Sequence, residues 1–193
     1  EAVKAGAEII PVYCFDPRQF EKTSFGFPKT GAFRAKFLLE SVADLRDNLQ
    51  KLGSNLVIRQ ELPEIAIPAI AQQLQVTSVY FQKEVTSEEI KVEKALTKAL
   101  KSIDVELTIF WGHTLYHPLS LPFNTDNLPE LFTDFRKEVE KKSEVNPTFP
   151  TPQKLPPLPA ELDPGKLPNL TDFNLEPPPE EPRAVLQFKG GET

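Results

Sequence analysis

The chain has 193 residues, of which 39% are hydrophobic and 26% are charged, and this composition is typical of a globular domain with a core of ordinary size. It contains no run of 18 apolar residues, so we expect no membrane span. The net charge of −6 and the lack of a basic stripe argue against this part of the protein as a direct contact surface for nucleic acid. The single cysteine, Cys14, excludes an internal disulfide, and its place in an apolar run predicts a buried side chain.

Four apolar runs alternate with helical patterns in the first part of the chain. Residues 1–7 have the pattern of the last turns of a helix, with Gly6 near its end. The apolar runs that predict strands are 8–15, 55–59, 77–81 and 106–111. Strands that alternate with helices form right-handed crossovers, so we expect an α/β fold with a doubly wound parallel sheet.

The clearest helix is predicted at 31–52, between the first two strands. Its apolar residues recur at helical spacing, and we expect the stripe of Phe33, Phe37, Leu45 and Leu49 to pack onto the sheet. On this interpretation Phe37→Ala removes a buried ring and lowers the free energy of unfolding by about 3–5 kcal/mol. Thr30 is the predicted N-cap and Gly53 the predicted stop.

Two further helices follow. Pro63 can open the first of them, but Pro68 predicts either a kink or a start near Ile67. The second is predicted at 86–103, where Thr86 and Glu89 have the spacing of a capping box.

The chain changes character after residue 128. One more helix is predicted within 129–142, and twelve of the twenty prolines then fall within residues 147–182. Such a segment excludes helices and central strands, so we expect an extended connector that spans roughly 110 Å. The lack of an initiator methionine and the Gly-Gly near the last residue predict a chain cut at both ends, with a second domain after it.

Acidic side chains follow two of the predicted strands. Glu84 and Glu88 flank the start of the helix at 86–103, and Asp16 follows the first strand. Acids at a helix start compensate its dipole, but the same edge of a parallel sheet is where ligands bind in doubly wound folds. His113 and His117 are four apart, but they lie in a predicted loop without further ligands, so we expect no metal site. No catalytic arrangement is evident.

Several segments in register resemble photolyases and DASH-type cryptochromes. The N-terminal part of the resemblance lies in VYCFDPR (12–18), KTGAFRAKFLLESVADLRDNL (29–49) and GSNLVIR (53–59). It continues in KEVTSEEIKVE (83–93), FWGHTLYHPLSLPF (110–123) and FKGGET (188–193). The resemblance covers almost the whole chain.

The resemblance implies a fold and a division into domains. Residues 1–128 would be the α/β antenna domain with strand order 3-2-1-4-5, lacking its first, central strand. Residues 129–187 would be a helix and the connector, and 188–193 would begin a helical FAD-binding domain. Strand 8–15 should therefore pair with 55–59 and strand 77–81 with 106–111, leaving a gap of roughly 10 Å between the pairs.

The resemblance also implies a light-dependent flavoprotein. The antenna is a methenyl folate in most members, and the implied contacts are Glu84, which is preferred, and Glu88, with Phe15, Asp16 and Arg34 as weaker candidates. FAD and the surface for damaged DNA would lie in the helical domain, and no membrane contact and a monomer are expected.

Three functions stay open at this point. The first is part of a DASH-type photolyase, a carbon–carbon lyase that repairs pyrimidine dimers, and the second is part of a signalling cryptochrome. The third is a stand-alone nucleotide-binding module. The expected location is the cytoplasm in a bacterium, and the chloroplast or the nucleus in a eukaryote. Whether this chain is an enzyme by itself is left open.

Overall fold

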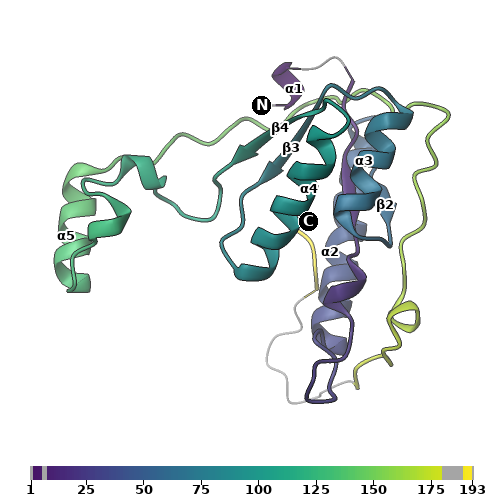
Figure 1. Ribbon diagram of the computed structural model, residues 1–193, viewed down its shortest axis with the longest axis horizontal. Coiled ribbons are helices and arrows are strands. Elements are labelled where there is room, and N and C mark those ends of the chain that lie inside the picture. Colours follow the sequence, from purple (N-terminus) through teal and green to yellow (C-terminus); the bar gives the residue numbers. More distant parts are fainter. Residues whose placement is uncertain (1, 6–7, 180–188, 193) are drawn as a thin grey trace. The chain divides into compact units, whose positions relative to one another are not determined.

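The computed structural model describes residues 2–5, 8–179 and 189–192 (Figure 1). The chain divides into two compact units, one of residues 1–75 with 152–193 and one of residues 76–151. Each unit holds one pair of parallel strands with helices around it, which confirms the predicted α/β class. The boundary at residue 75 lies inside the predicted antenna domain of residues 1–128. The limits proposed for the antenna domain and the connector remain a prediction. None of the described helices is long and apolar enough to cross a bilayer.

The first unit is built on two short strands. Its elements are α1 (Ala2–Ala5), β1 (Val12–Cys14), α2 (Ala32–Lys51), β2 (Val57–Arg59) and α3 (Pro63–Gln73). Tyr13 of β1 lies opposite Ile58 of β2 in a parallel register, as predicted. Both strands are shorter than the apolar runs that predicted them. Gly6, the predicted helix end, lies outside the described residues.

The core of the first unit lies between α2 and the strands. Phe15, Leu56 and Ile58 are at most 3% exposed and pack with Ala35 and Val42 of α2. Small side chains at 35 and 42 let the helix approach the strands closely, so the buried face of α2 is centred on them.

The predicted apolar stripe of α2 is wrong in three of its four residues. Phe33, Phe37 and Leu45 are 64%, 48% and 45% exposed, and only Leu49 packs against the core. Each residue turns a helix by about 100°, which places Phe33 and Phe37 on the side away from Ala35 and Val42. Phe37→Ala therefore creates no core cavity, and the predicted large loss of stability no longer holds.

The N-cap predicted for α2 and the capping box predicted for α4 are wrong, and the expectations for the two prolines are confirmed only in part. Gly31 rather than Thr30 precedes the first turn of α2, and Thr86 precedes its helix without a side-chain capping bond, so no capping box forms with Glu89. Pro63 opens α3, as predicted, and the helix continues through Pro68 to Gln73. The alternative start near Ile67 is therefore wrong, and the kink at Pro68 stays a prediction.

The proline-rich segment is extended but it is not a free spacer. Residues 152–179 contain no α-helix or strand, but Leu155, Leu162 and Phe173 are 4–9% exposed within the first unit. The N–H of Ile58 donates to the carbonyl oxygen of Pro164 at 2.8 Å, so the segment covers the outer edge of β2. At Gly165 (φ +70°) a Cβ atom would lie 2.3 Å from the Ile58 oxygen, so this approach requires glycine.

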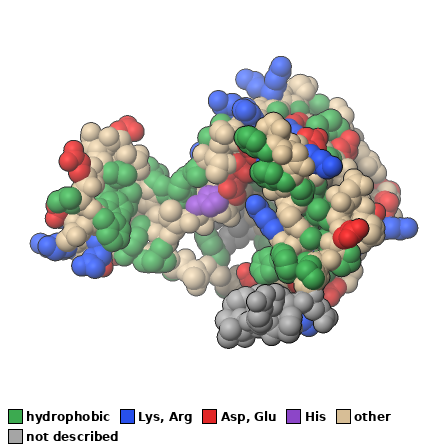
Figure 2. Space-filling view, turned by 90° about the horizontal axis from the view of Figure 1, so that it is seen from below, with side chains coloured by type: hydrophobic (Ala, Val, Ile, Leu, Met, Phe, Trp, Pro, Cys, Tyr) green, Lys and Arg blue, Asp and Glu red, His purple; other side chains and the backbone are tan. Residues whose placement is uncertain are grey.

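The second unit contains β3 (Ser78–Gln82), α4 (Ser87–Lys101), β4 (Glu106–Phe110) and α5 (Phe132–Lys142). Leu96 and Leu100 of α4 are almost fully buried, at 3% and 0% exposed. Figure 2 shows hydrophobic side chains gathered over the part of the unit that carries α5, where Leu131 and Phe132 are 66% and 74% exposed.

The strand pairing follows the predicted order. β1 pairs only with β2 and β3 pairs only with β4 among the described strands, so the two ladders form separate sheets. The Cα partners in the second ladder run from Ser78 with Glu106 to Gln82 with Phe110. This pairing is the one that the order 3-2-1-4-5 without its first strand requires, while the width of the gap stays a prediction.

Candidate functional site

The carboxyl ends of β3 and β4 bring together two stretches of chain that are far apart in sequence. Because the strands are parallel, Lys83 and Glu84 after β3 reach the same edge as Trp111 and His113 after β4. The backbone continues this pairing beyond the strands, since the Lys83 N–H donates to the Phe110 oxygen at 2.7 Å. The predicted site residue Glu84 therefore lies at the predicted edge.

Glu84 has a direct partner in the β4 loop. The His113 Nε2 and the Glu84 Oε2 are 2.8 Å apart, and these side chains are 33% and 44% exposed. The His113 ring also meets the Trp111 ring edge to face, with centroids 6.1 Å apart. The Trp111 Nε1–H in turn donates to the Thr114 Oγ1 at 2.7 Å. These contacts hold a carboxylate and an indole next to one another.

A recess of about 360 Å³ opens beside this chain of contacts. It is lined by Lys83, Ile109, Phe110, Trp111, His117 and Pro118. Lys83 is held by Glu93 of α4 through bonds of 3.0 and 3.2 Å. The His117 Nδ1 accepts from the Leu119 N–H at 3.1 Å, which fixes the turn at the rim. An apolar recess with a few fixed polar groups is the usual form of a site for a planar organic ligand.

The start of α4 contributes two more carboxylates. Glu88 lies in the first turn of α4 and is exposed. Glu89, also in the first turn, has a buried Oε2 without a hydrogen-bond partner among the described residues. An unpaired buried carboxylate oxygen is costly, and an N–H donor of a ligand would satisfy it. These carboxylates are hydrogen-bond acceptors, so this end of the unit suits a heterocycle that donates amino and amide hydrogens.

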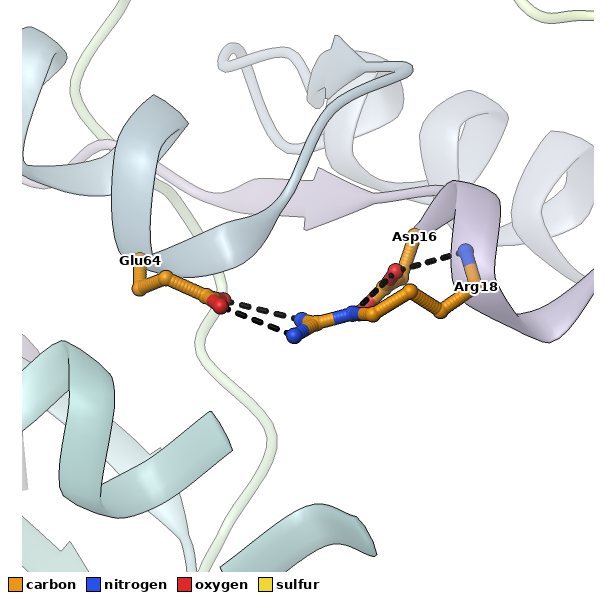
Figure 3. A network of polar contacts seen from close by, with 3 residues as sticks. All are labelled: Asp16, Arg18 and Glu64. Carbon is orange, nitrogen blue, oxygen red and sulfur yellow. Dashed lines mark hydrogen bonds and ion pairs between the residues drawn. The ribbon is translucent and has the colours of Figure 1, made fainter. Parts of the chain in front are cut away.

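The first unit holds a second polar cluster, at the end of β1 (Figure 3). Asp16 is 8% exposed, and its two oxygens accept three bonds of 2.6–3.0 Å from the Arg18 guanidinium. The other edge of the guanidinium donates to both oxygens of Glu64, in the first turn of α3, at 2.8 and 2.9 Å. The hydrogen bonds to Asp16, followed by those to Glu64, raise the pKa of Arg18 above its ordinary value.

The remaining two candidates of the first unit lie apart from a polar site. Phe15 is 1% exposed and its ring is part of the core, so it is not accessible to a ligand. Arg34 is exposed on α2. The candidates thus divide between the units, with Glu84 and Glu88 in one and Phe15, Asp16 and Arg34 in the other.

Sequence reasoning did not find Arg18, Glu64, Lys83, Trp111 or His113 as members of these clusters. A signal was present for His113, because loops that follow paired parallel strands meet at one edge. No comparable signal marked Glu64, which stands 46 residues after Arg18 and meets it only through the packing of α3.

Cys14 lies on β1 near the Asp16 cluster and is partly rather than fully buried, so its predicted burial is confirmed only in part. Its thiol should be inert. Burial, followed by the carboxylates of Asp16, Glu61 and Glu64, raises the pKa of its thiol to about 11, although Arg59 acts in the opposite direction. Only the thiolate reacts with disulfide reagents, so at pH 8 we expect Cys14 to react about a hundredfold more slowly in the folded protein than in denaturant. Mass spectrometry of the Cys14 peptide measures this, and equal rates would contradict the assignment.

Comparison with known proteins agrees with this fold. Residues 1–157 match the family model described as DNA photolyase. The chain is 56% identical over 192 residues to a cryptochrome DASH of Gloeobacter violaceus, covering 100% of this chain and 38% of that protein. Among solved structures, the Synechocystis sp. PCC6803 cryptochrome matches with a TM-score of 0.92 and 44% identity, over 98% of this chain and 39% of that chain.

A third match shows the fold alone. The photolyase of Sulfolobus tokodaii, solved with two FAD molecules, matches with a TM-score of 0.72 at 22% identity, over 97% of this chain and 39% of that one. The α/β fold of this chain is thus shared with solved cryptochrome and photolyase structures. The chain belongs to the DNA photolyase family, on the side of the DASH cryptochromes. It spans about two fifths of the length of the relatives it matches.

Proposed function

We propose that the full-length protein is a blue-light-dependent DASH-type photolyase that repairs cyclobutane pyrimidine dimers, and that this chain is its antenna domain. The observation that carries the proposal is the Glu84–His113–Trp111 arrangement beside an apolar recess, in a chain of the photolyase family. The FAD and the surface for damaged DNA belong to the remaining three fifths of the protein. No residue of this chain is given a catalytic role.

The proposed antenna is a methenyl folate, which absorbs near-ultraviolet light and passes the excitation to the flavin. Glu84 would accept from the amino and amide hydrogens of its pterin, and His113 holds this carboxylate in place. Trp111 and Phe110 supply apolar walls for a planar ring. Lys83, whose ammonium is paired with Glu93, also lines the recess. Glu88 is the alternative acceptor, and Asp16, Arg34 and Phe15 remain weaker candidates in the other unit.

Glu84→Gln in the full-length protein should weaken binding of the antenna by about tenfold, because a charged acceptor becomes a neutral one. The measurement is the near-ultraviolet absorbance of the retained folate, with the flavin bands as an internal reference. The matched control is Glu106→Gln, since Glu106 is an exposed glutamate at the opposite end of the same strand pair.

The absorbance of the folate and that of the flavin together decide this prediction. Loss of folate with the flavin retained in Glu84→Gln, and no change in Glu106→Gln, is the expected result. Retention of the folate by Glu84→Gln would exclude Glu84 as the contact, and Glu88→Gln is the next variant to measure.

Repair and signalling are separated by a direct assay. Under blue light, the full-length protein should split the thymine dimers of ultraviolet-treated oligonucleotides back into separate thymines. In the dark it should leave the dimers intact. Photoreduction of the flavin without any repair would favour a cryptochrome that signals through partners. The monomeric state and the cellular location stay predictions.

A further inference from the structure

The outer face of α2 carries a short backbone segment from the far end of the chain. The Gly190 N–H donates to the Glu40 Oε2 at 2.9 Å, and the Glu192 N–H donates to the Asp44 Oδ2 at 3.0 Å. Glu40 and Asp44 are one helical turn apart, so the two carboxylates match alternate N–H groups of the segment. The segment that ends at C runs beside α2 in Figure 1.

The contact depends on the absence of side chains in the segment. A Cβ atom at Gly190 would lie 2.0 Å from the Phe37 oxygen, and one at Gly191 (φ +112°) would lie 2.7 Å from the Asp44 Cβ. The backbone therefore lies directly on the helix. Ser41 leaves room for it, because its hydroxyl turns back and donates to the Phe37 oxygen at 2.8 Å.

Charges around the segment favour the same arrangement. The hydrogen bond from Lys36, followed by the one from the Gly190 N–H, lowers the pKa of Glu40 below its ordinary range, and the Lys189 ammonium adds to this. Because the pKa of Glu40 is lowered, ionised Glu40 stabilises the contact at pH values above the ordinary pKa of a glutamate. This stabilisation is lost as the pH falls through the lowered pKa of Glu40. Asp44 and Glu192 are the other charged groups at this contact.

We propose that Gly190–Glu192 form a clasp that fastens the end of the proline-rich connector to α2, and that the face of Phe37, Glu40, Ser41 and Asp44 is a binding surface for a glycine-glycine backbone. Apolar packing has little part in the clasp, since the two hydrogen bonds and the glycine contacts join it to the helix.

The test is hydrogen–deuterium exchange of the Glu192 amide in the full-length protein. In the unaltered protein this N–H should exchange at least about tenfold more slowly than an unstructured amide. Gly190→Ala should abolish the protection, because the added methyl group cannot fit against the Phe37 oxygen. Gly31→Ala is the matched control, since a Cβ atom there meets nothing within 4 Å.

A second variant tests the clasp from the helix side without changing the glycines. Ser41→Leu should fill the space under Gly190 and release the Glu192 amide, while Asp47→Leu, an exposed position on the same helix, should not. The protection of the Glu192 amide from exchange should also fall as the pH is lowered through the pKa of Glu40.

The outcomes are distinct. Loss of protection at Glu192 in both Gly190→Ala and Ser41→Leu, with the amides of β1 and β2 still protected, supports the clasp. A Glu192 amide that exchanges at the unstructured rate in the unaltered protein overturns it. So does unchanged protection in both variants, or a loss that extends through β1 and β2, because either result would show that the contact is not a local fastening.

Discussion

Phe15→Ala is expected to lower the free energy of unfolding by about 3–5 kcal/mol, because it leaves a ring-sized cavity in the core. Phe15 is 1% exposed and meets Tyr13 edge to face, with centroids 4.9 Å apart, and Phe173 at 5.6 Å. The Phe173 ring comes from the proline-rich segment, so the substitution should also loosen that segment. Denaturant titration followed by circular dichroism measures the loss.

The matched control for this prediction is Phe25→Ala. Phe25 is 83% exposed, and its one aromatic contact among the described residues is with Phe27, at 6.1 Å. Its replacement should change the free energy of unfolding by less than about 1 kcal/mol. Equal losses for the two variants would show that Phe15 is not a core residue.

Arg18→Met should lower the free energy of unfolding by about 2–3 kcal/mol, because it leaves two carboxylates without their shared cation. Asp16 is nearly buried, and the Glu64 side chain is 16% exposed. The Arg18 side chain is 37% exposed, so solvent screens part of the interaction and the expected loss is smaller than for a fully buried pair.

A double-mutant cycle shows whether the loss is electrostatic. Glu64→Gln combined with Arg18→Met should be less destabilised than the sum of the two single variants, since the second change removes one of the orphaned charges. Arg18→Lys should recover only part of the loss, because one ammonium cannot bond to four carboxylate oxygens as the guanidinium does. Strict additivity of Arg18→Met and Glu64→Gln would contradict the proposed network.

The candidate site was predicted in part. Glu84 was placed at the sheet edge from one rule, that ligand-type residues follow parallel strands. Its partners were not predicted, because His113 reaches Glu84 through the pairing of β3 with β4, whose register no local pattern specifies. Arg18 and Glu64 likewise meet only when α3 packs beside β1.

The order of strand pairing was implied by the resemblance to photolyases and DASH-type cryptochromes, whereas the sequence patterns alone determined the α/β class, the four strands and the helices between them. These features depend on the spacing of apolar residues and on where prolines interrupt it, and both are local properties of the chain. Resemblance of ordered motifs then indicated the family.

Only the tertiary structure decided which face of α2 is buried and where the proline-rich segment lies. Apolar residues lie on more than one side of α2, and the buried side is chosen by how closely Ala35 and Val42 allow the strands to approach. The segment shows no apolar periodicity, yet Leu155, Leu162 and Phe173 are buried because the first unit offers surfaces that match them. Such complementarity between distant parts of a chain is a property of the packed structure, and no short stretch of sequence records it.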